Sequence, residues 1–278
     1  MSGVRMSGVT PLVPGRPALG ADPVRAEPAG PGSLWLVDAR QLGAAALRLA
    51  RTVLDAGEQR RAAAFRREED RRCWVTAHVA LRLLLGARQG VAPAAVRLER
   101  EPCAVCGGSD GRPVAPDSGL WFSLSHSGDL ALLAFGAAPV GVDVEAVPEP
   151  AVVAELAGRL HPRETAGPEA ERAASFARLW VRKEAYLKGL GVGLARDPAL
   201  DYLGTGPVPA APARWSVADV AVPAGFAAAV ARTTTADPAG TQSGSATAGP
   251  AGTRSRSAQR TAVVSSSGSS RSPEVARR

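Results

Sequence analysis

Residues 120–146 read LWFSLSHSGDLALLAFGAAPVGVDVEA, and the strand pattern of the chain is clearest here. It divides into short apolar segments, 120–125, 129–136 and 139–146, that are separated by Gly, Ser, Asp or Pro. Short β-rich segments between turn-forming residues are typical of strands joined by tight connections. We therefore predict a small, mostly antiparallel sheet in the middle of the chain.

Helical patterns lie on both sides of this sheet. Residues 68–88 place apolar side chains such as Trp74 and Leu81 at helical spacing, and Gly90 follows them. Further helices are predicted at 41–64, 151–160 and 168–189, and further strands at 33–39, 95–99, 200–203, 214–220 and 225–231. Helices followed by strands occur twice, which predicts an α+β fold of two similar halves that meet near residue 138.

The composition bounds the class of protein. The chain has 278 residues, of which 45% are hydrophobic and 4% aromatic, and its formal net charge is +7. No run approaches the ~18 apolar residues of a membrane-spanning helix, and the N-terminus lacks the apolar run of a signal peptide. Three cysteines cannot form a disulfide framework. We expect a cytoplasmic protein with no membrane association.

The positive charge lies mainly at the ends of the chain. Residues 1–32 carry a net charge of +1 and residues 233–278 carry +4, which leaves +2 for residues 33–232. Residues 1–32 are rich in Pro and Gly without hydrophobic periodicity, and residues 233–278 have almost no large apolar side chain, so we expect both segments to be disordered. The Arg-rich tail leaves open a nucleic-acid-binding protein, although the nearly neutral middle has no basic stripe interleaved with aromatic residues.

The motif GVDVE at 141–145 carries two carboxylates. Side chains alternate along a strand, so Asp143 and Glu145 project from one face about 6.5 to 7 Å apart. Two such carboxylates can bind Mg²⁺, which takes its other ligands from water and substrate phosphates. The alternative is that both residues are simply the polar side of a half-exposed strand.

The motif LWVRKEAYLK at 179–188 contains both lysines of the chain. On a helix, Glu184 and Lys188 share one stripe, with Lys183 beside them. Glu184 could be a third metal ligand or a general base, and Lys188 could bind a phosphate. The alternative is an ordinary Glu–Lys pair on a helix surface.

Two further motifs have both a functional and a purely structural interpretation. FSLSHSGD at 122–129 ends a strand in a turn that could bind a phosphate or be a hydrogen-bonded hairpin turn. Cys103 and Cys106 resemble half of a zinc knuckle, but a closed zinc site needs four ligands and the other Cys and His residues show no matching spacing.

Four motifs in this order resemble the 4′-phosphopantetheinyl transferases, of the monomeric type that acts on carrier proteins of nonribosomal peptide and polyketide synthases in secondary metabolism. The motifs are DGRP (110–113), FSLSHSG (122–128), VGVDVE (140–145) and LWVRKEAYLKGLGVGL (179–194). The resemblance covers residues 33–232 and implies two pseudo-symmetric halves, 33–138 and 139–232, with the active site at their interface.

The resemblance also implies an activity and a set of site residues. Such enzymes move the phosphopantetheine of coenzyme A to a serine of an apo acyl or peptidyl carrier protein and release adenosine 3′,5′-bisphosphate. The implied ligands of Mg²⁺ are Asp143, Glu145 and Glu184. Glu184 and Lys188 are the implied catalytic residues, and the implied coenzyme-binding residues are Arg61, Arg112, Ser125, His126, Lys183 and Lys188. Cys73 stands where relatives often carry a basic residue, which weakens one expected phosphate contact.

Overall fold

The structure is a computed structural model of the chain. It describes residues 30–105, 107–109, 111–164, 167–168 and 171–234, together with the backbone of Val9–Pro11. These residues belong to one compact unit. The tail predicted to be disordered lies outside the described residues from position 235 onward, as does Cys106.

Five α-helices and nine strands occur in this part of the chain. The helices are α1 (Ala39–Val53), α2 (Ala56–Ala63), α3 (Glu68–Gln89), α4 (Pro150–Leu156) and α5 (Arg172–Leu190). The strands are β1 (Val9–Pro11), β2 (Leu34–Asp38), β3 (Glu99–Arg100), β4 (Pro113–Val114), β5 (Trp121–Ser127), β6 (Leu130–Gly136), β7 (Val140–Ala146), β8 (Trp215–Asp219) and β9 (Phe226–Thr233). The predicted α+β class is confirmed.

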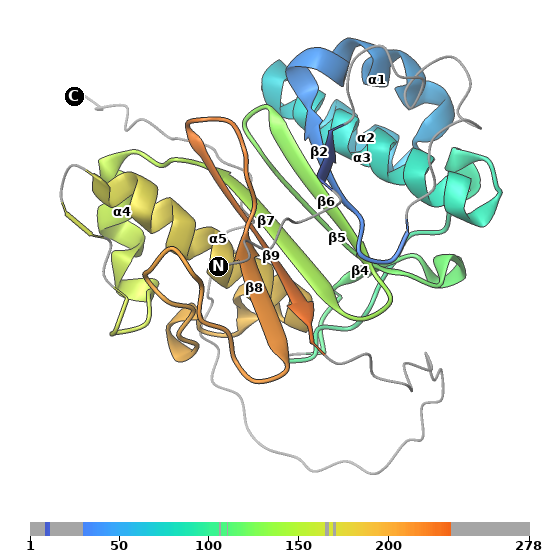
Figure 1. The fold of residues 1–278 in the computed structure, drawn as a ribbon. Coiled ribbons are helices and arrows are strands. Elements are labelled where there is room, and N and C mark those ends of the chain that lie inside the picture. The colour runs from blue at the N-terminus through green and yellow to red at the C-terminus, as the bar shows by residue number, and fades with distance from the viewer. Residues whose placement is uncertain are drawn as a thin grey trace, which may run out of the picture. The chain divides into compact units, whose positions relative to one another are not determined.

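The first sheet has the strand order β1-β2-β6-β5, and α1, α2 and α3 lie along one side of it (Figure 1). β6 pairs antiparallel with β2 and with β5. α3 packs its apolar face, which includes Trp74 and Leu81, into the same core as Phe122 of β5. The side of β5 that carries Phe122 and Leu124 therefore faces the helices.

The second sheet has the order β7-β9-β8 and is covered by α5 (Figure 1). The contact between α5 and β7 is very close, because a Cβ at Gly141 would overlap the backbone of Ala185 and Gly189. Glycine at 141 lets the helix lie directly on the strand, which holds residues 184 and 188 of α5 next to Asp143 of β7.

Serines on alternate positions of β5 join the two sheets. Ser123 Oγ accepts a hydrogen bond from the Val142 amide at 3.0 Å, and Ser127 Oγ accepts one from the Ala146 amide at 3.1 Å. The alternate serines of FSLSHS therefore point toward β7. They bond to β7 through their side chains, and the two strands do not form a backbone ladder. β5 and β7 consequently lie side by side, and the site residues on both strands are held in one register.

Two predictions about local structure are wrong. Residues 200–203 are not a strand; Pro198–Leu200 form a 3₁₀ turn because the Asp197 side chain accepts a hydrogen bond from the Ala199 amide. Only Glu99 of the segment 95–99 is in a strand, since Pro93 begins a 3₁₀ turn before it.

Within residues 1–32, for which disorder stays a prediction, the structure describes one short strand. Val9–Pro11 pairs in parallel with Leu34–Leu36 of β2, whose outer edge otherwise has unpaired backbone groups. Residues 1–8 and 12–29 lie outside the described part of the chain. Among the described residues, no helix is long and apolar enough to span a lipid bilayer.

Candidate active site

A buried ion pair lies where β5, β7 and α5 meet. Lys188 Nζ of α5 is 2.6 Å from Oδ1 of Asp143, which is completely buried on β7. Ser125 Oγ of β5 donates to the same carboxylate oxygen at 2.7 Å and lies 3.0 Å from Lys188 Nζ. Residues far apart in sequence therefore converge on one atom, Asp143 Oδ1.

The other oxygen of Asp143 has no hydrogen-bond partner among the described residues. Asp143 Oδ2 is buried, and buried carboxylate oxygens are almost always hydrogen-bonded or bound to a cation. This unsatisfied oxygen marks the position at which a positively charged ligand would be stabilised.

Two more carboxylates lie close enough to Asp143 to interact with its charge. Burial and repulsion from Asp143 raise the pKa of Glu145 to about 8. Burial raises the pKa of Glu184 to about 7, with Asp143 contributing in the same direction and Lys188 opposing it. The predicted metal ligands are thus brought into one electrostatic group that holds more negative charge than Lys188 neutralises.

This group fits a hard divalent cation. No three His, Cys, Asp or Glu side chains of the described residues are arranged as a complete metal-binding cluster. Mg²⁺ does not need one, because it commonly takes one or two carboxylates and completes its shell with water and phosphate oxygens. Asp143 Oδ2, which has no hydrogen-bond partner among the described residues, can serve as such a carboxylate ligand. The ionised forms of Glu145 and Glu184, which burial destabilises, would be stabilised by the same cation.

Lys188 remains charged in this environment. Burial acts to lower its pKa, but the neighbouring Asp143, Glu184 and Glu145 carboxylates outweigh burial and raise the pKa above its ordinary value. A permanent ammonium group beside the carboxylates can bind a phosphate oxygen.

Ser125 and His126 do not act from the same side of β5. Ser125 points toward β7, so the next residue, His126, points to the opposite face, the side packed against α3. Burial lowers the pKa of His126 to about 4, and the charges of His78 and Lys188 act in the same direction. Ser125 belongs to the Asp143 group, and His126 presents a neutral imidazole on the other face of β5; that both bind the adenosine 3′-phosphate stays a prediction.

Arg112 lies at the C-terminal end of α5. Its guanidinium stacks on the Trp121 ring with 4.4 Å between its Cζ and the ring centroid, and it donates to the carbonyls of Gly189 at 3.4 Å and Leu190 at 3.3 Å. Burial lowers its pKa. Arg61, also predicted to bind phosphate, is exposed on α2 and lies over the Phe65 ring.

Lys183 is not part of the Asp143 group. Its side chain is almost completely buried, its ammonium is 2.6 Å from Glu164 Oε2, and it donates to the Asp201 carbonyl. Five residues along an α-helix correspond to a rotation of about 140° between Lys183 and Lys188. The structure therefore gives Lys183 a structural role, in a buried ion pair with Glu164, and not the predicted contact with the coenzyme.

Replacing Lys183 by methionine should destabilise the protein without weakening coenzyme binding. The Glu164 carboxylate would stay buried without its cation, which costs about 3 kcal/mol. Thermal melting measures the loss of stability, and calorimetric titration with coenzyme A measures binding. A weaker affinity for coenzyme A with an unchanged melting temperature would show that Lys183 is a binding residue.

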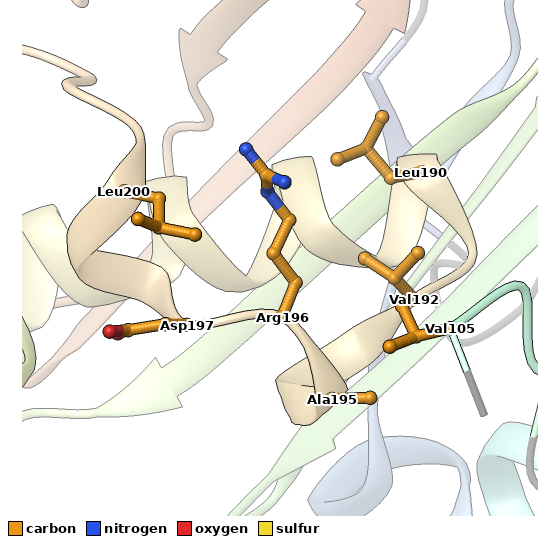
Figure 2. A pocket seen from close by; sticks show the side chains of 7 residues that line it. All are labelled: Val105, Leu190, Val192, Ala195, Arg196, Asp197 and Leu200. Atoms are coloured by element: carbon orange, nitrogen blue, oxygen red, sulfur yellow. The ribbon is translucent and has the colours of Figure 1, made fainter. Parts of the chain in front are cut away.

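One pocket lies beyond the C-terminal end of α5. It has a volume of about 460 Å³ and is lined by apolar side chains that include Leu190, Val192 and Leu200, with Arg196 and Asp197 beside them (Figure 2). None of the predicted site residues lines it. Arg196 is paired with Asp201 at 2.9 Å, so this pocket offers an apolar surface instead of a free cation.

Comparison with known proteins identifies the family. A model of the 4′-phosphopantetheinyl transferase superfamily matches residues 139–211, which contain β7 and α5. The chain is 34% identical over 212 residues to the 4′-phosphopantetheinyl transferase HetI of Nostoc sp., covering 71% of this chain and 86% of that protein. It is 38% identical over 91 residues to the 4′-phosphopantetheinyl transferase AcpT of Escherichia coli, covering 30% of this chain and 47% of that protein.

These matches establish the class of enzyme. The chain belongs to the 4′-phosphopantetheinyl transferase superfamily. The resemblance of the four sequence motifs to this superfamily is thereby confirmed.

Proposed function

We propose that this enzyme transfers the phosphopantetheine group of coenzyme A to a serine of an apo acyl or peptidyl carrier protein. The observation that carries the proposal is the Asp143–Lys188–Ser125 cluster, with an unsatisfied carboxylate oxygen and two further carboxylates around it. Such a cluster can bind a diphosphate and a divalent cation side by side, which is what transfer from coenzyme A requires.

Asp143, Glu145 and Glu184 would hold Mg²⁺. The ion, when bound, neutralises charge on the diphosphate of coenzyme A. Lys188 binds an oxygen of the same diphosphate, because its ammonium stays charged and is held in place by Asp143 and Ser125. These residues position the diphosphate and neutralise its charge. Positioning and charge neutralisation account for most of the catalysis in phosphoryl transfer.

Glu184 is the best placed proton acceptor. A carboxyl group with a pKa of about 7 is a more effective base near neutral pH than an ordinary carboxylate. The carrier serine oxygen forms a new bond to the phosphorus that bears the pantetheine arm, and its proton passes to Glu184. The phosphorus–oxygen bond to the nucleotide breaks, and adenosine 3′,5′-bisphosphate leaves with that oxygen.

The carrier protein and pathway follow from the family resemblance. We assign the substrate to carrier proteins of nonribosomal peptide or polyketide synthesis, with the enzyme acting as a monomer. His126 and Arg112, at the α3 side and at the end of α5, are the proposed contacts to the adenosine part of coenzyme A.

Detection of the nucleotide product tests the proposal. Incubation with coenzyme A, Mg²⁺ and an apo carrier protein should release adenosine 3′,5′-bisphosphate in proportion to the carrier added. The matched control is the same carrier with its acceptor serine replaced by alanine, which should release none. Release that is independent of the acceptor serine would indicate hydrolysis of coenzyme A and would refute the proposed transfer.

Activation by Mg²⁺ should depend on pH. Glu145 and Glu184 have pKa values of about 8 and about 7, so both are partly protonated at neutral pH and must lose protons to bind a cation. The Mg²⁺ concentration for half-maximal rate should fall as the pH rises from about 6 to about 8.5, by up to about tenfold per unit for each proton displaced. Transfer rates across a MgCl₂ series at each pH measure this shift, and a constant half-maximal concentration would contradict it.

A further inference from the structure

The junction between β5 and β7 contains two neighbouring contacts beside the candidate active site. Ser123 Oγ of β5 accepts a hydrogen bond from the Val142 amide of β7 at 3.0 Å. Two residues further along β5, Ser125 Oγ donates to Oδ1 of Asp143, the residue after Val142, at 2.7 Å. One serine thus holds the backbone of β7, and the next serine holds the side chain that follows on β7.

Ser123 and Val142 are each fixed within their own sheet. Ser123 pairs with Ala134 of β6 in the first sheet, and Val142 pairs with Val230 of β9 in the second. Ser123 is 6% exposed and Val142 is completely buried, so the hydrogen bond between them lies in a medium of low dielectric, where it is strong. This bond therefore fixes the position of one sheet relative to the other.

Three elements close around Asp143, and Ser123 makes one of the contacts between them. β7 lies against α5 at Gly141, where a Cβ would overlap the helix backbone. α5 reaches β5 through Lys188 Nζ, which is 3.0 Å from Ser125 Oγ. β5 reaches β7 through Ser123. A shift of β7 relative to β5 would separate Asp143 Oδ1 from its partners on the other two elements.

Loss of the Ser123 hydroxyl would remove the acceptor of a buried amide. A buried amide without an acceptor is costly, so we expect β7 to move until the Val142 amide finds water or another acceptor. Asp143 follows Val142 directly, so this movement displaces its carboxylate from Ser125 and Lys188. A displacement of about 1 Å at reacting groups can lower a rate by as much as about a hundredfold.

We propose that Ser123 is a positioning residue of the enzyme, whose hydrogen bond to the Val142 amide sets β7 against β5 so that Asp143 meets Ser125 and Lys188. This assignment rests on the proposed function, because the contact that Ser123 positions is the one proposed to bind the diphosphate of coenzyme A. Ser123 acts through the backbone of β7 and is assigned no contact with coenzyme A or with the carrier protein.

Ser123→Ala tests the assignment beside a matched serine. Ser118 is also 6% exposed, and its hydroxyl bonds with Ala115 and Leu120 in the turn before β5. Both alanine variants should melt about 2 to 6 °C below the wild type, since each loses the hydrogen bonds of a buried hydroxyl. Ser123→Ala should also weaken binding of coenzyme A with Mg²⁺, measured by calorimetric titration, about fivefold and lower kcat/KM about tenfold. Ser118→Ala should leave both unchanged.

The conservative variant separates positioning from stability. Ser123→Thr keeps an acceptor oxygen for the Val142 amide, so it should bind coenzyme A within about twofold of the wild type. Ser123→Ala should both lower kcat and raise KM for coenzyme A, because Asp143 and Lys188 are displaced together. If Ser123→Ala melts lower but binds coenzyme A and turns over as Ser118→Ala does, the positioning role is overturned. A wild type that binds no coenzyme A would instead refute the proposed function.

Discussion

Asp143→Ala is expected to lower kcat/KM for transfer by about a thousandfold or more. Asp143 is the residue on which Lys188 and Ser125 both converge, and its free oxygen is the expected cation ligand. Loss of a metal ligand removes several kcal/mol of charge stabilisation in the transition state, and each factor of ten in rate corresponds to about 1.4 kcal/mol. The rate with a saturating carrier protein, measured across a MgCl₂ series, provides the test.

Folding must be separated from chemistry in this variant. Asp143→Asn keeps the shape of the side chain and a hydrogen-bonding oxygen for Ser125 and Lys188, so it should fold and still lose most of the activity. Replacement of Cys103 and Cys106 by serine is the contrasting change, because no role in metal binding is proposed for them, and it should leave turnover nearly intact. Two results together would place the metal at the cysteines instead of at Asp143. The Asp143→Asn variant would stay active, and the cysteine variant would lose both its bound zinc and its activity.

Lys188→Met is expected to lower kcat/KM about a hundredfold, the usual effect of removing one charged donor from a transition-state site. Methionine preserves the length and packing of the side chain but leaves Asp143 without its cation and the diphosphate without its donor. Steady-state kinetics with varied coenzyme A should show a fall in kcat as well as a rise in KM, because charge at the leaving diphosphate grows as the bond breaks.

The other lysine of the chain provides the matched comparison. Lys183 and Lys188 lie on the same helix, but Lys183 is paired with Glu164 and is nearly inaccessible. Lys183→Met should therefore lower the melting temperature more and kcat/KM less than Lys188→Met does. The reverse order would show that the two lysines have been assigned to the wrong roles.

Local patterns in the sequence predict most of the fold. The helix expected at 68–88 is α3, and the strands expected at 129–136 and 139–146 are β6 and β7, because each is a periodic apolar run that ends at Gly or Pro. The segment 200–203 was misread since its apolar residues follow a proline and a capping aspartate, and that local hydrogen bond outweighs strand propensity. The pairing of β7 with β9 joins residues 80 to 92 positions apart in the sequence, and no local pattern shows it.

The sequence predicts which site residues lie together when they belong to the same strand or helix. Alternation along β7 places Asp143 and Glu145 together, and helical spacing on α5 places Glu184 and Lys188 together. The partner of each charge depends on tertiary packing: Glu164, 19 residues from Lys183 in the sequence, is what removes that lysine from the site. Ser123 was missed for the same reason, because its partner, the Val142 amide, belongs to another strand.

Intact-mass measurement shows whether the enzyme attaches phosphopantetheine to a carrier protein. Apo carrier proteins from peptide, polyketide and fatty-acid synthesis are incubated with the enzyme, coenzyme A and Mg²⁺, beside parallel reactions without coenzyme A and with Asp143→Asn. We expect at least one carrier to gain the mass of a single phosphopantetheine group on its acceptor serine, only in the complete reaction with the wild-type enzyme. If every carrier keeps its apo mass while the enzyme is folded and supplied with Mg²⁺ and coenzyme A, the proposed transfer is contradicted.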